Sequence, residues 1–196
     1  MRARRHRLLQ LAAAQAGFFS SAQALAFGYS HQGQKYHADR GNWRRVGRGL
    51  FRLPEWPVGE HDDLHRWSVW SRGQGVLSHR SAARLHGLPA PPGDVVELIV
   101  PRSFRAVAPQ VVAPQAGALQ AGAPQAGALQ RVRLHRPGAR GGLVELSDDE
   151  IEVVAGLRVT TRARTLRDLA AELADEVPEP RRTELEAPET DGWRQW

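Results

Sequence analysis

The stretch that decides the fold runs from residue 20 to residue 53 and reads SSAQALAFGYSHQGQKYHADRGNWRRVGRGLFRL. Its first half predicts two short helices separated by a glycine, one over residues 22–27 and one over residues 31–40 that is capped by Ser30. Its second half changes to the alternating pattern of two short strands joined by a turn at residues 47–49. Helix, turn, helix and hairpin in this order predict a winged helix-turn-helix.

A further helix is expected upstream, over residues 5–16, where leucine and alanine recur at helical spacing and Gly17 follows as a stop. Phe18 and Phe19 are then expected in the connection to the next helix. Three helices and a hairpin therefore fit into residues 1–55, which we predict to be a winged helix-turn-helix DNA-binding domain.

The positive charge is concentrated in this first part of the chain. Residues 1–53 hold nine arginines and one lysine against a single acid, Asp39, a net charge of +9, whereas the remainder holds seventeen arginines against twenty acids, a net charge of −3. A concentrated positive face favours a polyanionic partner, because each neutralised phosphate releases counterions. Lys35 is the sole lysine, which compositional bias explains, but such bias does not explain the asymmetry.

Residues 30–40 are the expected recognition helix, whose N-terminal half meets base edges in a helix-turn-helix. Ser30, Gln32, Gln34 and Lys35 are the candidate base-reading residues, since glutamine can address adenine and lysine can address guanine. We expect Gln32, Gln34, Lys35 and His37 to be exposed. A solvated polar helix face without a ligand explains these side chains equally well.

The hairpin supplies the stronger signal, because many arginines lie within thirteen residues that also contain Trp43 and Phe51. Alternation predicts that Trp43 points inward and that several arginines point outward, towards phosphates or into a minor groove. The candidates for DNA contact here are Arg40, Arg44, Arg45 and Arg48, with Arg52 in the same run. The basic start, with arginines at positions 2, 4, 5 and 7, is interpreted either as an arm on the DNA backbone or as a frayed terminus.

The second part of the chain, residues 60–175, is predicted to be a mixed α/β domain, so that the whole protein is of the α+β class. The elements expected there are helices over residues 62–70, 78–85 and 162–174, the second capped by Ser78 and the third by Thr161, and strands over residues 95–100, 132–135, 151–154 and 157–159. Leu166, Leu169 and Leu173 are expected to form the apolar face of the last helix.

Two segments are expected to be irregular. Residues 106–130 are predicted to be a low-complexity insertion, because PQAGALQ at residues 114–120 returns unchanged at residues 124–130 and such a composition buries little apolar surface. The proline-rich, acidic residues 176–196 are predicted to be a disordered tail.

Catalysis and metal binding find little support in the sequence. The absence of cysteine excludes disulfides, thiolate zinc sites and cysteine nucleophiles. Ser78 and His79 are adjacent, but a helix cap with exposed side chains explains them better than a nucleophile and its base. His61 and His65 lack a third metal ligand in the pattern. We therefore expect no catalytic residue, no metal and no cofactor, and, without an apolar run of about 18 residues, a cytoplasmic protein without a membrane partner.

Several runs together resemble the AbiEi-type antitoxins of type IV toxin-antitoxin systems. These runs are ALAFGYS at residues 24–30, GNWRRVGRGLF at 41–51, VLSHRSAA at 76–83, LHGLP at 85–89, the strand at 95–101 and VTTRARTLRDL at 159–169. The resemblance implies a winged helix-turn-helix that represses its own operon from its own promoter. It also implies a second domain that counteracts a nucleotidyltransferase-like toxin, as a functional partner that the antitoxin need not contact.

Two other functions fit parts of the sequence. One is a DNA-targeting remnant of a nuclease-linked protein, although the second part has no lysine for a carboxylate-lysine metal site. The other is a protein-interaction module whose basic start binds an acidic partner instead of DNA.

Overall fold

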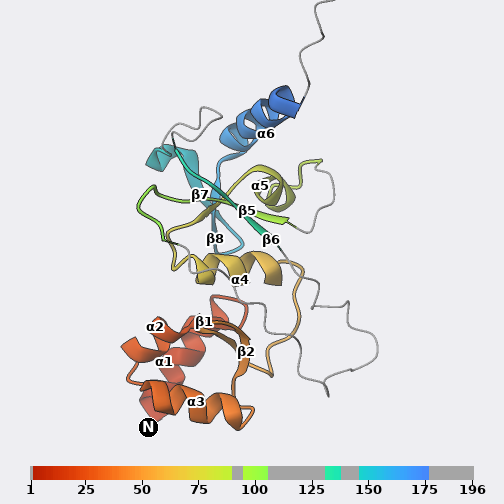
Figure 1. Ribbon diagram of the computed structural model, residues 1–196. Coiled ribbons are helices and arrows are strands. Elements are labelled where there is room, and N and C mark those ends of the chain that lie inside the picture. The colour runs from red at the N-terminus through yellow and green to blue at the C-terminus, as the bar shows by residue number, and fades with distance from the viewer. Residues whose placement is uncertain (1, 90–94, 106–130, 138–145, 177–196) are drawn as a thin grey trace, which may run out of the picture.

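The protein is described by a computed structural model over residues 2–89, 95–105, 131–137 and 146–176, and its elements form two groups, each built around its own sheet (Figure 1). Helices and strands are mixed in both groups, which confirms the predicted α+β class. The expected insertion at residues 106–130 and the expected tail beyond residue 176 lie outside the described residues. No helix in the described ranges is long and apolar enough to cross a membrane.

The first group of elements has the order of a winged helix-turn-helix. β1, β3 and β2 form an antiparallel sheet in that spatial order, and β2 and β3 are the predicted hairpin. Its elements are α1 (Arg2–Ala13), β1 (Phe18–Ser20), α2 (Ser21–Ala26), α3 (His31–Asp39), β2 (Arg44–Gly47) and β3 (Leu50–Arg52).

Strand β1 was not predicted, and it explains the two adjacent phenylalanines. Neighbouring side chains of a strand point to opposite faces. Phe19 accordingly packs with Trp43 and Phe51 in the core of the first group, whereas Phe18 packs with Val69 of the second group. A strand of three residues is too short to show alternation in the sequence, so the local pattern could not reveal it.

Helix α1 begins and ends three residues earlier than predicted. The chain turns sharply after the helix, where Ala16 and Gly17 both have positive φ. Gly17 has a φ of +81°, and a Cβ atom at this position would lie 2.5 Å from Cγ of Trp56. Glycine is therefore required both by the left-handed backbone and by the close approach of the indole ring.

The second group is built on a mixed five-stranded sheet with the spatial order β6-β5-β4-β8-β7. Helix α4 covers one face of this sheet, and α5 and α6 cover the other (Figure 1). The predicted elements are all present, and β4 is an unpredicted addition. The elements of this group are α4 (Asp62–Trp70), β4 (Val76–Leu77), α5 (His79–Leu85), β5 (Val95–Ile99), β6 (Arg131–His135), the 3₁₀ turn η1 (Asp148–Glu150), β7 (Ile151–Val154), β8 (Leu157–Thr160) and α6 (Arg162–Glu176).

Alternation along β5 gives the two faces of the larger sheet different chemistry. Val96 and Leu98 join Leu64 and Trp67 of α4 in an apolar core. Glu97, between them in sequence, points to the face that α5 and α6 cover. The α4 side of the sheet is therefore apolar, whereas the α5–α6 side buries polar side chains such as Glu97 among apolar ones.

The expected apolar face of α6 is wrong. Leu166 and Leu173 are 50% and 61% exposed and Leu169 is half-buried, whereas the side chains that the helix buries fully are Arg164, Thr165 and Asp168. Arg164 donates to Asp168 and forms an ion pair with Glu150, and Thr165 bonds to Thr160 on β8. The helix packs on the polar face of the sheet, so polar side chains, not leucines, are turned inward.

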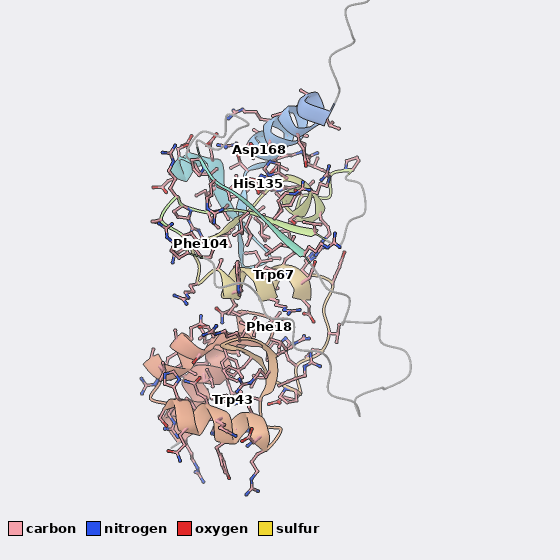
Figure 2. The ribbon with its side chains drawn as sticks, viewed as in Figure 1. Phe18, Trp43, Trp67, Phe104, His135 and Asp168 are labelled. Carbon is pink, nitrogen blue, oxygen red and sulfur yellow. The ribbon has the colours of Figure 1, made fainter. Side chains whose placement is uncertain are left out.

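Helix α4 also connects the two groups of elements, since it lies between the smaller sheet and the larger one (Figure 2). Phe18 and Leu50 of the first group pack with Val69 of α4. The buried guanidinium of Arg52, which was expected among the outward-pointing arginines, forms an ion pair of 2.5 Å with Asp62 in the first turn of α4. The two groups thus share both an apolar and an ionic contact.

Candidate nucleic-acid interface

The helix-turn-helix is held together by polar side chains at its turns. Ser20 and Gln23 form a capping box at the start of α2, in which Ser20 Oγ accepts from the Gln23 amide at 3.2 Å and Gln23 Oε1 accepts from the Ser20 amide at 2.8 Å. Ser30 caps α3 by accepting from the Gly33 amide at 3.1 Å. The predicted caps of both helices are therefore confirmed.

Gln34 is buried, and the expectation that it would be exposed is wrong. Its side chain is 3% exposed and faces α2. Nε2 donates to the carbonyl oxygens of Tyr29 at 3.0 Å and Ser21 at 3.2 Å, and Oε1 accepts from Ser21 Oγ at 2.6 Å. With all of these bonds made inside the fold, Gln34 fixes α3 against α2 and does not point towards a base edge.

The exposed side of α3 is a continuous strip of positions spaced by four residues. Positions four apart lie on the same side of a helix, one turn from each other. Two such rows run side by side, at positions 31, 35 and 39 and at positions 32, 36 and 40. The sequence pattern predicted only some of these residues to be exposed. The residues of this strip, which we call the α3 strip, are His31, Gln32, Lys35, Tyr36, Asp39 and Arg40.

Tyr36 and His31 are the members of the α3 strip that sequence reasoning missed. Tyr36 is 54% exposed, with the guanidinium of Arg40 lying 5.4 Å from its ring centroid. Once Gln34 is known to be buried, helical phase places Tyr36 outside; that phase could not be fixed from the sequence. His37, expected outside, is half-buried because its ring stacks on Trp43 at 4.7 Å.

Lys35 makes a local ion pair that is weak enough for an anionic ligand to displace. Its Nζ lies 2.5 Å from Asp39 Oδ2, one helical turn away, and both side chains are well exposed. Exposed pairs at this spacing contribute only about 0.3–0.5 kcal/mol. A phosphate or a guanine acceptor can therefore replace Asp39 at little cost.

Trp43 points inward, as the alternation predicted, whereas Arg44 and Arg45 are neighbours on β2 and lie on opposite faces of the small sheet, Arg45 over the Phe51 ring and Arg44 on the side of Arg52 and Arg66. Trp43 is buried among aromatic rings that include Phe19 and Phe51. Arg44 and Arg45 are exposed, and neither has an ion-pair partner within the described ranges. Cations held on a rigid strand without a carboxylate partner are suited to bind an anion.

Arg48 lies apart from the other candidate residues. It belongs to the hairpin turn, whose Gly49 carbonyl accepts from the Ser21 amide at 2.8 Å. The carbonyl of Val46, just before the turn, accepts from Arg66 of α4 at 2.9 Å. The turn therefore approaches the second group of elements, and Arg48 lines a hollow beside α4.

The basic start of the chain is the beginning of α1, neither an arm nor a frayed end. Arg4 Nη1 donates to the Gly28 carbonyl at 2.9 Å, and its guanidinium lies 4.2 Å from the ring centroid of Tyr29. Burial lowers the pKa of His37 on α3, and the charges of Arg4 and Arg5 lower it further. These arginines consequently lie close to α3, at a helix N-terminus whose dipole already favours an anion.

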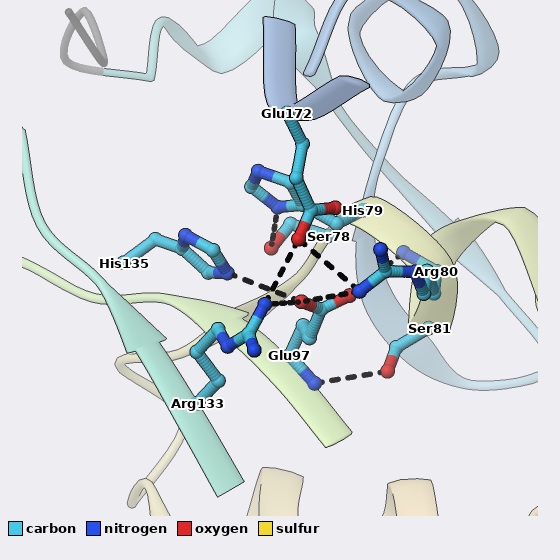
Figure 3. A network of polar contacts seen from close by, with 8 residues as sticks. All are labelled: Ser78, His79, Arg80, Ser81, Glu97, Arg133, His135 and Glu172. Atoms are coloured by element: carbon cyan, nitrogen blue, oxygen red, sulfur yellow. Dashed lines mark hydrogen bonds and ion pairs between the residues drawn. The ribbon is translucent and has the colours of Figure 1, made fainter. Parts of the chain in front are cut away.

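The second group of elements contains a buried polar network on the α5–α6 side of its sheet (Figure 3). Glu97 is 1% exposed and accepts from the Arg80 amide at 2.9 Å. Arg133 Nη1 lies 3.4 Å from its carboxylate, and both arginines bond to Glu172 on α6, at 3.1 Å from Arg80 and 2.8 Å from Arg133. The network joins β5, β6, α5 and α6.

Ser78 and His79 belong to this network, so the expectation of a helix cap with exposed side chains is wrong. Both residues are buried, and Ser78 Oγ lies 3.0 Å from His79 Nδ1 instead of capping the helix. The His79 ring stacks on His135 at 3.8 Å (Figure 3), and its pKa is lowered to about 4, first by burial and then by His135. The Ser78 hydroxyl and the His79 imidazole are thus turned into the protein and not towards its surface.

The arrangement of α2, α3 and the hairpin is that of a winged helix-turn-helix. Residues 6–54 match a family described as transcriptional regulator, AbiEi antitoxin. This match confirms the predicted resemblance to AbiEi-type antitoxins over these residues, which contain α2, α3, the whole smaller sheet and most of α1. No curated protein matches the chain.

Proposed function

We propose that this protein is a sequence-specific, double-stranded-DNA-binding autorepressor that acts on its own promoter. One observation carries the proposal. The α3 strip belongs to a helix fixed by buried bonds, with Arg4 and Arg5 of α1 close to His37 on the same helix and the exposed Arg45 over Phe51 on the hairpin, and Asp39 is the single acid in residues 1–53. Such a surface matches a duplex in shape and in charge.

In the proposed complex, α3 enters the major groove and the hairpin follows the backbone. Gln32 and Lys35 read base edges near the start of α3, with Ser30 beside them. Arg40, Arg44 and Arg45 bind phosphates, which position the protein without reading sequence. Tyr36, which is exposed and long enough to reach a base or a sugar, replaces Gln34 among the reading residues.

We further propose that the two groups of elements act as separate domains, residues 1–55 for DNA and residues 60–175 for the antitoxin activity of a type IV system, in the cytoplasm. The matched family supports the antitoxin assignment. The second domain then opposes a nucleotidyltransferase-like toxin, a functional partner that it need not contact. Co-expression with a nucleotidyltransferase-like toxin, taken from the neighbouring gene if that gene encodes one, tests this assignment: restored growth supports it, and unrelieved toxicity at confirmed expression of both proteins contradicts it.

DNA binding is tested by fluorescence anisotropy of the purified full chain with a labelled duplex of its upstream region, over a series of salt concentrations. We expect binding that weakens linearly in log Kd against log salt, and tighter binding than to a scrambled duplex. Arg45→Ala should weaken binding to both duplexes and reduce the salt slope by about one. Arg162→Ala, an exposed arginine of α6 at the other end of the protein, is the matched control and should change neither.

The proposed recognition of base sequence by α3 has a separate test with the same anisotropy assay. Lys35→Ala or Gln32→Ala should weaken binding to the upstream duplex by about 1–3 kcal/mol while leaving the scrambled duplex much less affected. Equal affinity of the unmodified protein for the two duplexes would contradict specificity. Absence of any salt-dependent binding would contradict DNA binding as a whole and favour the protein-interaction alternative.

A further inference from the structure

A hollow lies between the hairpin turn and α4, with walls from both groups of elements. Its volume is about 290 Å³, close to the lower end of the range of about 300–1,000 Å³ for small-molecule sites. One wall is the turn at residues 47–49 with residues 20–22, another is the last two turns of α4 with Arg72, and a third is Phe104 with Arg105. We call this hollow the α4 cavity.

The α4 cavity is lined by four arginines and by no acidic residue. These arginines are Arg48, Arg66, Arg72 and Arg105. Within the described chain none of the four has an ion-pair partner, whereas Arg52 is paired with Asp62 and Arg84 with Asp63 close by. Arg52 and Arg84 thus each have a carboxylate partner, whereas the arginines that line the α4 cavity have none in the described chain.

Arg66 is the arginine of the α4 cavity whose environment is least favourable for a positive charge. It is half-buried, and its guanidinium donates to a neutral acceptor, the carbonyl of Val46, at 2.9 Å. Burial lowers its pKa, and the charge of Arg44 lowers it further. A desolvated cation without an opposite charge is unfavourable, and a bound anion removes that cost.

Aromatic rings form the apolar part of the lining. Trp67 and Trp70 meet edge to face at 5.2 Å, and Trp70 meets Phe104 in the same way at 5.6 Å. Figure 2 shows Trp67 and Phe104 on the α4 side of the larger sheet. Trp70 is only half-buried, so it offers an apolar edge to a ring held in the cavity.

We propose that the α4 cavity binds a small phosphorylated ligand with a planar ring, of the class and size of a nucleoside monophosphate. The arginines hold the phosphate, because guanidinium groups match phosphate in charge and geometry. The accessible edge of Trp70, which Trp67 and Phe104 hold in place from behind, contacts the ring.

The experiment measures binding of adenosine 5′-monophosphate to the purified full chain without DNA, by isothermal titration calorimetry and by quenching of tryptophan fluorescence. Adenosine and inorganic phosphate are titrated in parallel. We expect the nucleotide to bind at least about tenfold more tightly than either fragment, since it alone engages both parts of the lining. Because no DNA is present, the outcome is independent of the proposed repressor function.

Two variants and one control locate the site. Arg72→Asn, chosen because asparagine tolerates the φ of +58° at this position, and Arg105→Gln should each weaken nucleotide binding by about tenfold or more. Arg162→Gln on α6 should leave it unchanged. Unaltered thermal unfolding of each variant shows that any loss is not caused by misfolding.

Three results would overturn the proposal. The first is absence of nucleotide binding to the unmodified protein at low salt. The second is equal binding of nucleotide and inorganic phosphate, which would reduce the cavity to an anion site. The third is an equal loss in Arg162→Gln, which would mean that the nucleotide is attracted by overall charge.

Discussion

Replacing Gln34 by alanine separates a structural role of this residue from a base-reading role. The substitution removes the bonds to Tyr29 and Ser21 and leaves two buried carbonyl oxygens without this donor. Each such bond contributes about 1 kcal/mol, so Gln34→Ala should lower the free energy of unfolding by about 3 kcal/mol. The loss falls on the contact between α2 and α3.

Urea denaturation followed by circular dichroism measures this change, and the matched control is Gln32→Ala on the exposed side of the same helix. The control should lie within about 0.5 kcal/mol of the unmodified protein, as surface substitutions usually do. In the DNA assay, Gln34→Ala should weaken binding to specific and scrambled duplexes alike, because it loosens α3 as a whole. A Gln34→Ala protein of unchanged stability but altered sequence preference would refute the reasoning.

Three further predictions concern stability. Asp62→Ala should lower the thermal stability by about 3 kcal/mol, because it leaves Arg52 buried without its counterion, whereas Asp63→Ala, whose partner Arg84 is more exposed, should lower it less; equal losses would contradict this account. Because the pKa of His79 is lowered to about 4 from 6.5, the unfolded chain binds a proton that the folded one does not, and the free energy of unfolding should fall as pH decreases between these values, by about 3 kcal/mol at most. The same measurement on His79→Gln should show a flatter pH dependence, and an unchanged slope would assign it to other groups. Gly17→Ala should destabilise more than Gly41→Ala, since both have positive φ but only the first would place a Cβ against Trp56; equal effects in urea denaturation would rule out the steric contribution.

Local patterns predicted the elements well because each carried its own signal. The capping box at Ser20 and the cap at Ser30 fixed where α2 and α3 begin, and the Gly47–Gly49 turn fixed the hairpin. Strands β1 and β4 escaped prediction because two or three residues show no periodicity. They are stabilised by pairing with strands distant in sequence, which a local pattern does not record.

The candidate interface was predicted in part. Charge asymmetry located it in residues 1–53, since net charge is a property of the sequence alone. The side of each helix that faces inward depends on the neighbour it packs against, and so the burial of Gln34 and the exposure of Tyr36 were out of reach. The same applies to Arg52, whose partner Asp62 lies on the next helix of the chain.

By itself, the sequence determined the α+β class, the order of the helix-turn-helix and hairpin, and the concentration of arginine at the start of the chain. These depend on interactions between residues close in sequence or on composition. Only the tertiary structure decided that α6 turns Arg164 and Asp168 inward, that Ser78 and His79 are buried around Glu97, and that the α4 cavity is lined by four arginines without an ion-pair partner among the described residues. Those features depend on which surfaces meet when the chain packs, because burial and ion pairing are set by neighbours that lie far away in sequence.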